Sequence, residues 1–363
     1  MPIEATSTAP LPPFLPSTPD GVLAAAALLR EGEIVALPTE TVYGLAADAL
    51  NEAAVRRIFA AKGRPFFDPL IVHLPAAGAV ADLAEIPAAL EALARRFWPG
   101  PLTLVLRKKP CVPDVVTAGG PTVAVRVPAH PLMRRVLEAC ALPLAAPSAN
   151  PFGYVSPTRA EHVRDSLGSR APWVLDGGEC RHGLESTILH LATQDGVPAL
   201  LRPGPVSRDE LEEVLGMRVR MGAAAATEPA PPTAEIHGGA AVSDEALAEA
   251  ECLPAPGMLS RHYSPRTPVL LRAAGTPPRL LADVPRQAVV WQRKPPHGAE
   301  SSKDVFWFSE SGLPADVARG VFSLLRRLDG LGYALLHVEL APDSPLAPAI
   351  NDRLRRAAAR RAG

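Results

Sequence analysis

Between residues 20 and 215, stretches with helical spacing of apolar residues alternate with short, nearly continuous apolar runs. The helical stretches are 20–32, 51–63, 130–141 and 207–216, with Asp20, Asn51 and Ser207 as expected N-caps and Gly32 and Gly63 as stops. The apolar runs predict strands over 33–38, 70–74, 102–108, 122–127, 187–191 and 199–203. Because these runs carry few polar positions, the pattern favours a sheet that is covered on both faces.

The pattern changes after residue 216, where the chain becomes rich in Ala, Pro, Gly and acidic residues. It then resumes with expected strands at 267–273, 287–292, 304–309 and 333–340 and expected helices at 313–330 and 344–363. This order predicts a second, smaller α/β domain with a parallel sheet. We therefore expect a flexible leader at 1–19, a first domain at 20–215, a linker or lid at 216–264 and a C-terminal domain at 265–363.

Composition narrows the class of protein. The 363 residues suit about two domains, and 47% hydrophobic with 21% charged residues is ordinary for a globular chain. A formal net charge of −1 gives no general attraction to nucleic acid or anionic membrane. The four cysteines form no C-x-x-C pair, and the N-terminus has no signal-peptide pattern, so we expect a reduced, cytoplasmic protein with no membrane span.

Two polar segments sit beside predicted strands. In "LPTETVYGL", Thr39 and Thr41 flank Glu40 after a strand, which is typical either of a helix-capping turn or of a binding loop at a strand end. In "KGRPFFDPLIVH", Lys62 and Arg64 follow a helix end, where a favourable dipole interaction is one explanation. Pro65 and Pro69 make this segment rigid, however, and a rigid Lys-x-Arg pair is suited to holding an oxyanion.

Further polar groups follow the same arrangement. Arg126 lies among apolar strand residues and either faces solvent or points into a cleft to hold a carboxylate. Ser148 and Asn150 lie in the proline-bracketed "APSANP", which is otherwise a turn-rich loop, and Ser186 and Arg202 lie near late strands. Together these groups predict an anionic, phosphate-bearing ligand. The chain has neither the G-x-x-x-x-G-K-[ST] nor the G-x-G-x-x-G nucleotide motif.

Six motifs in this order, "PTETVYGL", "KGRP..DPLIVH", "FWPGPLTLVL", "RVPAHP", "APSAN" and "GLESTI", resemble the YrdC-like threonylcarbamoyl-AMP synthases. The stretches "PGMLSRHYSP" and "INDRLRRAA" resemble the two-domain form of that family. The resemblance covers most of residues 20–363. It implies an α/β fold with a YrdC-like twisted open sheet and flanking helices, plus a smaller Rossmann-like α/β C-terminal domain.

The resemblance also implies a nucleotidyltransferase. It would make L-threonylcarbamoyladenylate from L-threonine, bicarbonate and ATP, with Mg²⁺ accompanying ATP and pyrophosphate released. The product would pass to a tRNA threonylcarbamoyltransferase, with weak or indirect tRNA contact. Two alternatives are an RNA-binding module and a hydrogenase-maturation carbamoyltransferase. The low net charge disfavours the first, and the absence of zinc-finger cysteine pairs disfavours the second.

Site residues carry over by motif. The expected threonine-binding residues are Thr41, His73, Arg126, Ala146 and Ser186. The expected ATP-binding residues are Lys62, Arg64, Asp68, Thr122, Ser148, Asn150, Ser156, Arg202 and Tyr263, with Lys62 and Arg64 also assigned to catalysis. Metal ligands are not assigned. Asp68 departs from the family pattern, where an asparagine is expected, and its carboxylate would repel phosphate unless Mg²⁺ or Arg64 compensates.

The linker has two interpretations. A segment rich in proline and alanine can simply tether two domains. "PGMLSRHYSP" differs from the rest because it regains an aromatic ring and basic groups, so we expect it to fold back as a lid over the nucleotide, with Tyr263 closing the site.

Overall fold

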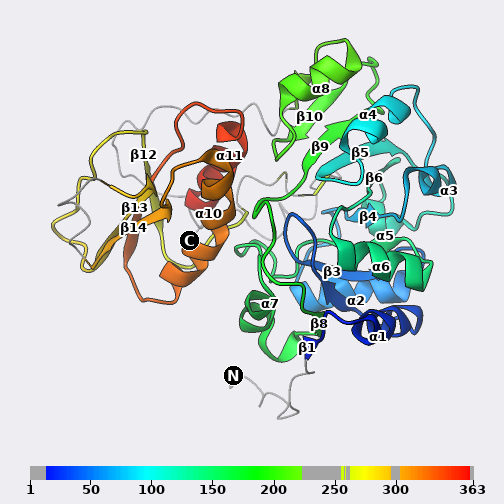
Figure 1. The fold of residues 1–363 in the computed structure, drawn as a ribbon, viewed down its shortest axis with the longest axis horizontal. Helices are drawn as coiled ribbons and strands as arrows, with labels where there is room; N and C mark the ends of the chain where they lie inside the picture. Colours follow the sequence, from blue (N-terminus) through cyan, green and yellow to red (C-terminus); the bar gives the residue numbers. More distant parts are fainter. Residues whose placement is uncertain (1–13, 223–254, 257, 259–261, 296–302, 360–363) are drawn as a thin grey trace.

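The structure is a computed structural model that describes residues 14–222, 255–256, 258, 262–295 and 303–359 (Figure 1). It contains an eleven-stranded sheet and a four-stranded sheet, which lie in different parts of the molecule. The helices α10 and α11 of the C-terminal part lie between the smaller sheet and the first domain. Among the described residues, no helix is both long and apolar enough to cross a membrane.

The large sheet has the order β1-β8-β2-β3-β7-β4-β6-β5-β9-β10-β11 and mixes parallel with antiparallel pairs. Its strands are β1 Phe14–Leu15, β2 Val35–Leu37, β3 Gly44–Asp48, β4 Ile71–His73, β5 Leu102–Arg107, β6 Thr122–Arg126, β7 Leu144–Ala145, β8 Trp173–Leu175, β9 Thr187–His190, β10 Ala199–Arg202 and β11 Arg220–Met221. Central strands such as β2 are wholly buried, which confirms the expectation that apolar runs mark a sheet covered on both faces.

The helices of the first domain are α1 Pro19–Arg30, α2 Glu52–Lys62, α3 Val80–Leu83, α4 Leu90–Phe97, α5 Asp114–Thr117, α6 Pro131–Cys140, α7 Ala160–Leu167 and α8 Arg208–Leu215, with 3-10 turns η1 Ala77–Ala79 and η2 Gly168–Arg170. Local signals set several boundaries as expected. Asn51 caps α2, Gly63 ends it in the left-handed conformation at φ 61°, and Ser207 begins α8 with a capping box.

Two predicted boundaries were wrong. The leader was expected to be flexible to residue 19, but β1 pairs in parallel with β8, and α1 begins at Pro19 with Thr18 rather than Asp20 as its N-cap. Asp20 instead lies in the first turn, where its negative charge interacts favourably with the helix dipole. The linker was expected from residue 216, but β11 pairs with β10, so the large sheet extends to 221.

The C-terminal sheet is parallel throughout, in the order β12-β15-β13-β14, as the sequence predicted. Its elements are β12 Val269–Arg272, β13 Gln287–Arg293, β14 Val305–Ser309, α10 Pro314–Asp329, β15 Leu335–Glu339 and α11 Ala347–Ala358. A shared hydrophobic core joins the two domains, because Val42, Val155 and Leu184 of the first domain pack with residues of α10 and α11.

Candidate functional site

The expected site residues largely converge on one small cavity, formed by loops at strand ends of the large sheet and by the end of the linker. Nine of them line it: Thr41, Arg64, His73, Arg126, Ala146, Ser148, Ser186, Arg202 and Tyr263. The cavity leaves about 50 Å³ for solvent-sized molecules. Since one water needs roughly 10–15 Å³ of such space, there is room for a few waters and not for a nucleotide.

Arg126 points into this cavity from the last position of β6, and it is 3% exposed. Its Nη1 donates to Thr41 Oγ1 at 2.9 Å, its Nη2 lies 2.6 Å from Glu40 Oε1, and its Nε donates to the carbonyl of Gly100. Burial alone would raise the pKa of Glu40, but the charge and hydrogen bond of Arg126 lower it. The cleft orientation expected for Arg126 is therefore the one found, and a carboxylate of the protein already pairs with it.

His73 lies directly beside Arg126, because β4 and β6 pair in parallel with these two residues in register. It is 2% exposed, and its Nδ1 has no hydrogen-bond partner among the described residues. Burial, and then the charge of Arg126, lower the pKa of His73 to about 3. The imidazole is consequently neutral near pH 7, and it can offer a ligand a hydrogen bond without adding charge.

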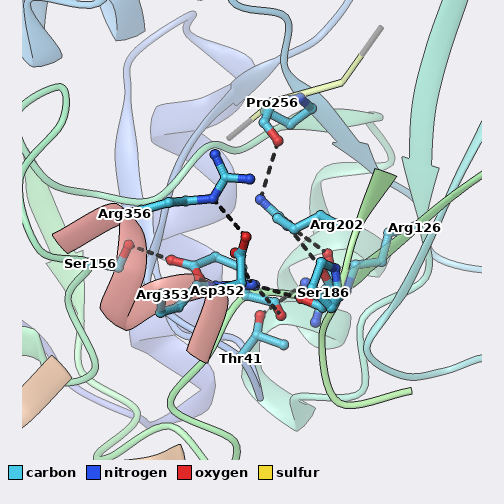
Figure 2. A network of polar contacts seen from close by, with 11 residues as sticks. Thr41, Arg126, Ser156, Ser186, Arg202, Pro256, Asp352, Arg353 and Arg356 are labelled. Carbon is cyan, nitrogen blue, oxygen red and sulfur yellow. Dashed lines mark hydrogen bonds and ion pairs between the residues drawn. The ribbon is translucent and has the colours of Figure 1, made fainter. Parts of the chain in front are cut away.

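Ser186 forms the opposite wall. Its hydroxyl lies 2.7 Å from Thr103 Oγ1 and accepts from Arg202 Nη2 at 3.1 Å, while Arg202 Nε donates to the carbonyl of Ser186. Arg202 Nη1 also reaches the carbonyl of Pro256 in the linker at 3.4 Å (Figure 2). Arg202 thus connects the wall of the cavity with the segment that covers it.

Arg64 is held by its own loop. Its Nε donates to the carbonyl of Asp68 at 3.0 Å, its Nη2 donates to the carbonyl of Pro69, and the same Nη2 lies 2.9 Å from Asp68 Oδ2. Both side chains are almost fully buried. The Arg64 guanidinium thus neutralises the buried carboxylate of Asp68, as a carboxylate at position 68 requires. Asp68 therefore does not present an uncompensated charge to the cavity.

Lys62 and Asn150 lie behind the lining residues. Lys62 Nζ donates to the carbonyls of Ser148 and of Asn150, and Asn150 Nδ2 donates to the carbonyls of Pro151 and Tyr154. Burial, and then the charge of Arg64, lower the pKa of Lys62 well below its usual value. In this conformation both side chains hold the loop that places Ser148 in the cavity.

Ser156 connects the site to the C-terminal domain through Glu185. Ser156 Oγ donates to Glu185 Oε1 at 2.5 Å, and Arg353 of α11 donates from Nε to Glu185 Oε2 at 2.9 Å. Arg353 is fully buried and also contacts the carbonyl of Pro203 and the carboxylate of Asp352, which in turn binds Arg356. Figure 2 shows this network reaching from α11 to Arg202 and Ser186.

Tyr263 lies where the linker, the cavity and both C-terminal helices meet. Its ring contacts those of His262 and Phe322, with centroids 4.1 and 5.5 Å away, and the Arg353 guanidinium lies 5.4 Å from it. Tyr263 has φ 61°, a left-handed conformation that is unfavourable for an aromatic residue. Such strain persists only where the surroundings hold it, and it is common at ligand clamps.

Thr122 is a predicted site residue that the structure does not bring to the cavity. It begins β6, four positions before Arg126, and pairs with Arg107 of β5; it does not line the cavity. Among the described residues, no three His, Cys, Asp or Glu side chains form a group that could hold a metal ion. The carboxylates of Glu40, Asp68 and Glu185 are each paired with an arginine.

Sequence reasoning missed three contributors. Glu185 and His262 line the cavity, and Arg353 holds Glu185 from the other domain. Glu185 and His262 lie inside quoted motifs, "GLESTI" and "PGMLSRHYSP", where they were passed over for their neighbours. Arg353 also lies inside a quoted motif, "INDRLRRAA", but its role could not be read there because it depends on the packing of α11 against the first domain.

Known proteins resemble this chain in both domains. Residues 27–204 match the Sua5/YciO/YrdC family, described as telomere recombination, and residues 206–359 match a family described as threonylcarbamoyl-AMP synthase, C-terminal domain.

Among curated relatives, the threonylcarbamoyl-AMP synthase of Pyrococcus abyssi is 39% identical over 92% of this chain and 92% of its own length. That of Bacillus subtilis is 39% identical over 94% of both chains. A putative synthase of Mycobacterium tuberculosis is 37% identical and spans 54% of this chain but 90% of its own.

The fold agrees with these relatives. The crystal structure of P. abyssi Sua5 complexed with L-threonine matches with a TM-score of 0.79 and 38% identity, covering 93% of this chain and 94% of that one. Both domains and their order are therefore shared with that protein. The chain belongs to the threonylcarbamoyl-AMP synthase family, in its two-domain form.

Proposed function

We propose that this chain forms L-threonylcarbamoyladenylate and pyrophosphate from L-threonine, bicarbonate and ATP through the cavity described above. The observation that carries the assignment of the site is the convergence of Arg64, Arg126 and Arg202 with neutral His73 in one buried cavity. Three guanidinium groups suit a reaction whose three substrates and two products all carry oxyanions.

The threonine side of the site would be formed by Thr41, His73, Arg126 and Ser186, with the backbone near Ala146. Three of the five N–H groups of Arg126 are engaged, which leaves two for the amino acid carboxylate. His73 Nδ1, which has no hydrogen-bond partner among the described residues, would bind a polar group of the substrate. The small side chain of Ala146 leaves the backbone open to close approach.

The nucleotide side would be formed by Arg64, Ser148 and Arg202, supported by Lys62, Asn150 and Ser156. Because Lys62 uses two of its three donors on the Ser148–Asn150 loop, its first role is to position that loop, and one N–H remains for a phosphate oxygen. Thr122 would need a nucleotide that extends well beyond the present cavity, and it remains a prediction.

The reaction asks for positioning and charge neutralisation more than for covalent catalysis. The threonine amine attacks bicarbonate and forms a carbamate with loss of water. A carbamate oxygen then attacks the α-phosphorus of ATP, and pyrophosphate leaves. Arginines held rigidly by ion pairs and carbonyls cost little reorganisation when charge develops on the phosphoryl oxygens. Mg²⁺ would enter with ATP.

ATP needs more room than the described conformation offers. The segment that restricts the cavity contains Pro256, His262 and Tyr263, and we infer that it moves as a lid, with the strained Tyr263 as its closing residue. Closure would keep water from a hydrolysable adenylate. Protease cleavage near Arg261 should slow when ATP and threonine are added, if the segment closes as a lid; Arg261 itself lies outside the described residues. The adenylate would then serve a tRNA threonylcarbamoyltransferase in the cytoplasm.

The decisive experiment is direct. The full-length protein is incubated with MgATP, bicarbonate and L-threonine, and the mixture is analysed by mass spectrometry for the adenylate and by an enzymatic assay for pyrophosphate. Both products should appear together and disappear when threonine or bicarbonate is omitted. Pyrophosphate release without threonine dependence, or no adenylate at any substrate concentration, would reject the proposal.

A further inference from the structure

A second cavity, of about 570 Å³, lies in the C-terminal domain at the carboxyl ends of its parallel strands. Trp291 and Gln292 of β13, Glu339 of β15, Val317 of α10 and Ile350 of α11 contribute to its walls. Its volume lies within the range of small-molecule sites, and none of its lining residues lines the cavity of the first domain.

The topology places this cavity where open parallel sheets bind ligands. β13 and β15 are neighbours in the sheet. From the end of β13 the chain continues to β14, on one side of this pair, whereas from the end of β15 it continues to α11, which packs on β12 on the other side. Ligands of such sheets bind in the crevice outside the strand ends at this switch point. Gln292 and Glu339 lie at the two strand ends that border it.

The N-termini of α10 and α11 both reach the cavity. Their N-cap residues, Leu313 and Leu346, are apolar and provide no side-chain hydrogen bond. Asp316 already supplies a negative charge to the first turn of α10, whereas none of the residues in the first turn of α11 is acidic. The positive end of the α11 dipole, beside the lining residue Ser344, is therefore the place for an anion.

Gln292 provides an independent sign of a ligand. Its side chain is buried, with 6% exposure, and its Nε2 donates to the carbonyl of Glu339, but its Oε1 has no hydrogen-bond partner among the described residues. Glu339 cannot supply a donor, and its own oxygens accept from the backbone N–H groups of Gly275 and Gln292. A buried amide oxygen without a donor is unfavourable, so a ligand N–H at this position would stabilise it.

The remaining walls suit a flat ring. Val317, Ala341 and Ile350 add apolar surface on the side of Gln292. The neighbouring Trp291 points to the other face of the sheet, where the Arg272 guanidinium lies 4.0 Å from its ring centroid. We propose that the cavity binds a nucleoside monophosphate, with the phosphate at the N-terminus of α11 beside Ser344 and an N–H of the base on Gln292 Oε1. This site goes beyond the synthase reaction and does not depend on it.

The test is calorimetric titration of the full-length protein with AMP. Ser344 Oγ accepts from the N–H of Ala347, and Ser344→Asp keeps an acceptor there while it adds a negative charge where the phosphate is expected. AMP binding at this site should weaken at least about tenfold. Asp343→Asn is the opposite charge change at a neighbouring residue that also lines the cavity, and it should bind AMP at least as tightly as the wild type.

A second variant separates base from phosphate. Gln292→Met removes the amide oxygen, so it should weaken AMP severalfold and leave ribose 5-phosphate unchanged. The proposal fails if the AMP isotherm of Ser344→Asp equals that of the wild type. It also fails if inorganic phosphate binds as tightly as AMP, since the base would then have no pocket. A synthase assay on the same samples distinguishes the two proposals, because adenylate formation reports only on the first cavity.

Discussion

The large sheet mixes parallel and antiparallel pairs, and Pro256, His262 and Tyr263 help to line the cavity at its strand ends. The small sheet is parallel, and residues of its own domain line the cavity at its strand ends. The polar groups that line the two cavities also differ in whether the protein already supplies their hydrogen-bond partners. In the first cavity, Arg64, Arg126 and Arg202 already contact carbonyls, hydroxyls or carboxylates of the protein. In the second, Gln292 Oε1 has no hydrogen-bond donor among the described residues, and the first N–H of α11 is held only by Ser344.

The two cavities therefore differ in what ligand binding requires of the protein. The first is preorganised and almost filled, so under the proposed function we expect ATP binding to need movement of the segment at Pro256, His262 and Tyr263 and the exchange of existing contacts. The second requires neither. The two cavities are also joined, because α10 and α11 begin at the second cavity and carry Phe322 and Arg353, which contact the Tyr263 and Glu185 of the first.

The largest expected effect comes from removing the second domain. Truncation after Gly222 should lower adenylate formation at least about a hundredfold, because it removes Tyr263 and leaves Glu185 without Arg353. A single-domain relative suggests that the large sheet can fold alone, and circular dichroism should confirm this for the truncated chain. Full activity of a folded truncated chain would show that the linker is only a tether.

A point change at the interface should act next most strongly. Arg353→Met should lower the free energy of unfolding by about 3–5 kcal/mol, because it leaves the buried Glu185 carboxylate unpaired. Adding Glu185→Gln to this variant should restore part of the lost unfolding free energy. Arg355→Met, at an exposed position of the same helix, should change the unfolding free energy little. Equal effects of the two arginine changes in denaturant titrations would contradict this account.

Arg64 tests the nucleotide side of the first cavity. Arg64→Ala should reduce adenylate formation at least about tenfold, since a hydrogen bond to a charged group contributes roughly 1.5–3 kcal/mol. The same change leaves Asp68 unpaired, so Arg64→Ala with Asp68→Asn is needed to separate binding from folding. A stable double variant with wild-type ATP dependence would remove Arg64 from the phosphate site.

Arg126 tests the threonine side. Arg126→Gln, made together with Glu40→Gln to avoid an unpaired buried carboxylate, should raise the KM for threonine several times more than the KM for ATP. Serine lacks one methyl group and should be discriminated against by only about 1–3 kcal/mol in either protein. A change confined to ATP dependence would assign Arg126 to the nucleotide.

The last expected effect is a loss of stability in acid. The pKa of His73 is about 3 in the folded protein, below its usual value, so the unfolded chain binds the extra proton first as the pH falls. Neutral His73 thus contributes stability that is present above about pH 6.5 and is lost towards pH 3, at up to about 1.4 kcal/mol per pH unit. His73→Asn should flatten the dependence of the unfolding free energy on pH in this window, and an unchanged slope would contradict it.

Much of the local structure could be predicted from the sequence, because its causes are local. Asn51, Gly63 and Ser207 set helix ends by capping and by left-handed backbone, and apolar runs marked most strands. Residues 44–48 escaped this reasoning, since the loop expected after Pro38 turns back at once into β3 and pairs with β2. The motifs also identified nine residues that line the cavity, but they did not show which residues these nine pair with.

The tertiary structure decided what those residues do. Pairing of β4 with β6 sets His73 beside Arg126, and the fold of one loop gives Asp68 to Arg64. The packing of α11 brings Arg353 to Glu185 across 168 positions of sequence, and the order of the four parallel strands creates the cavity at Gln292. Local sequence fixes backbone conformation and burial, whereas pairing of charges and the shape of a cavity depend on contacts between segments that only folding brings together.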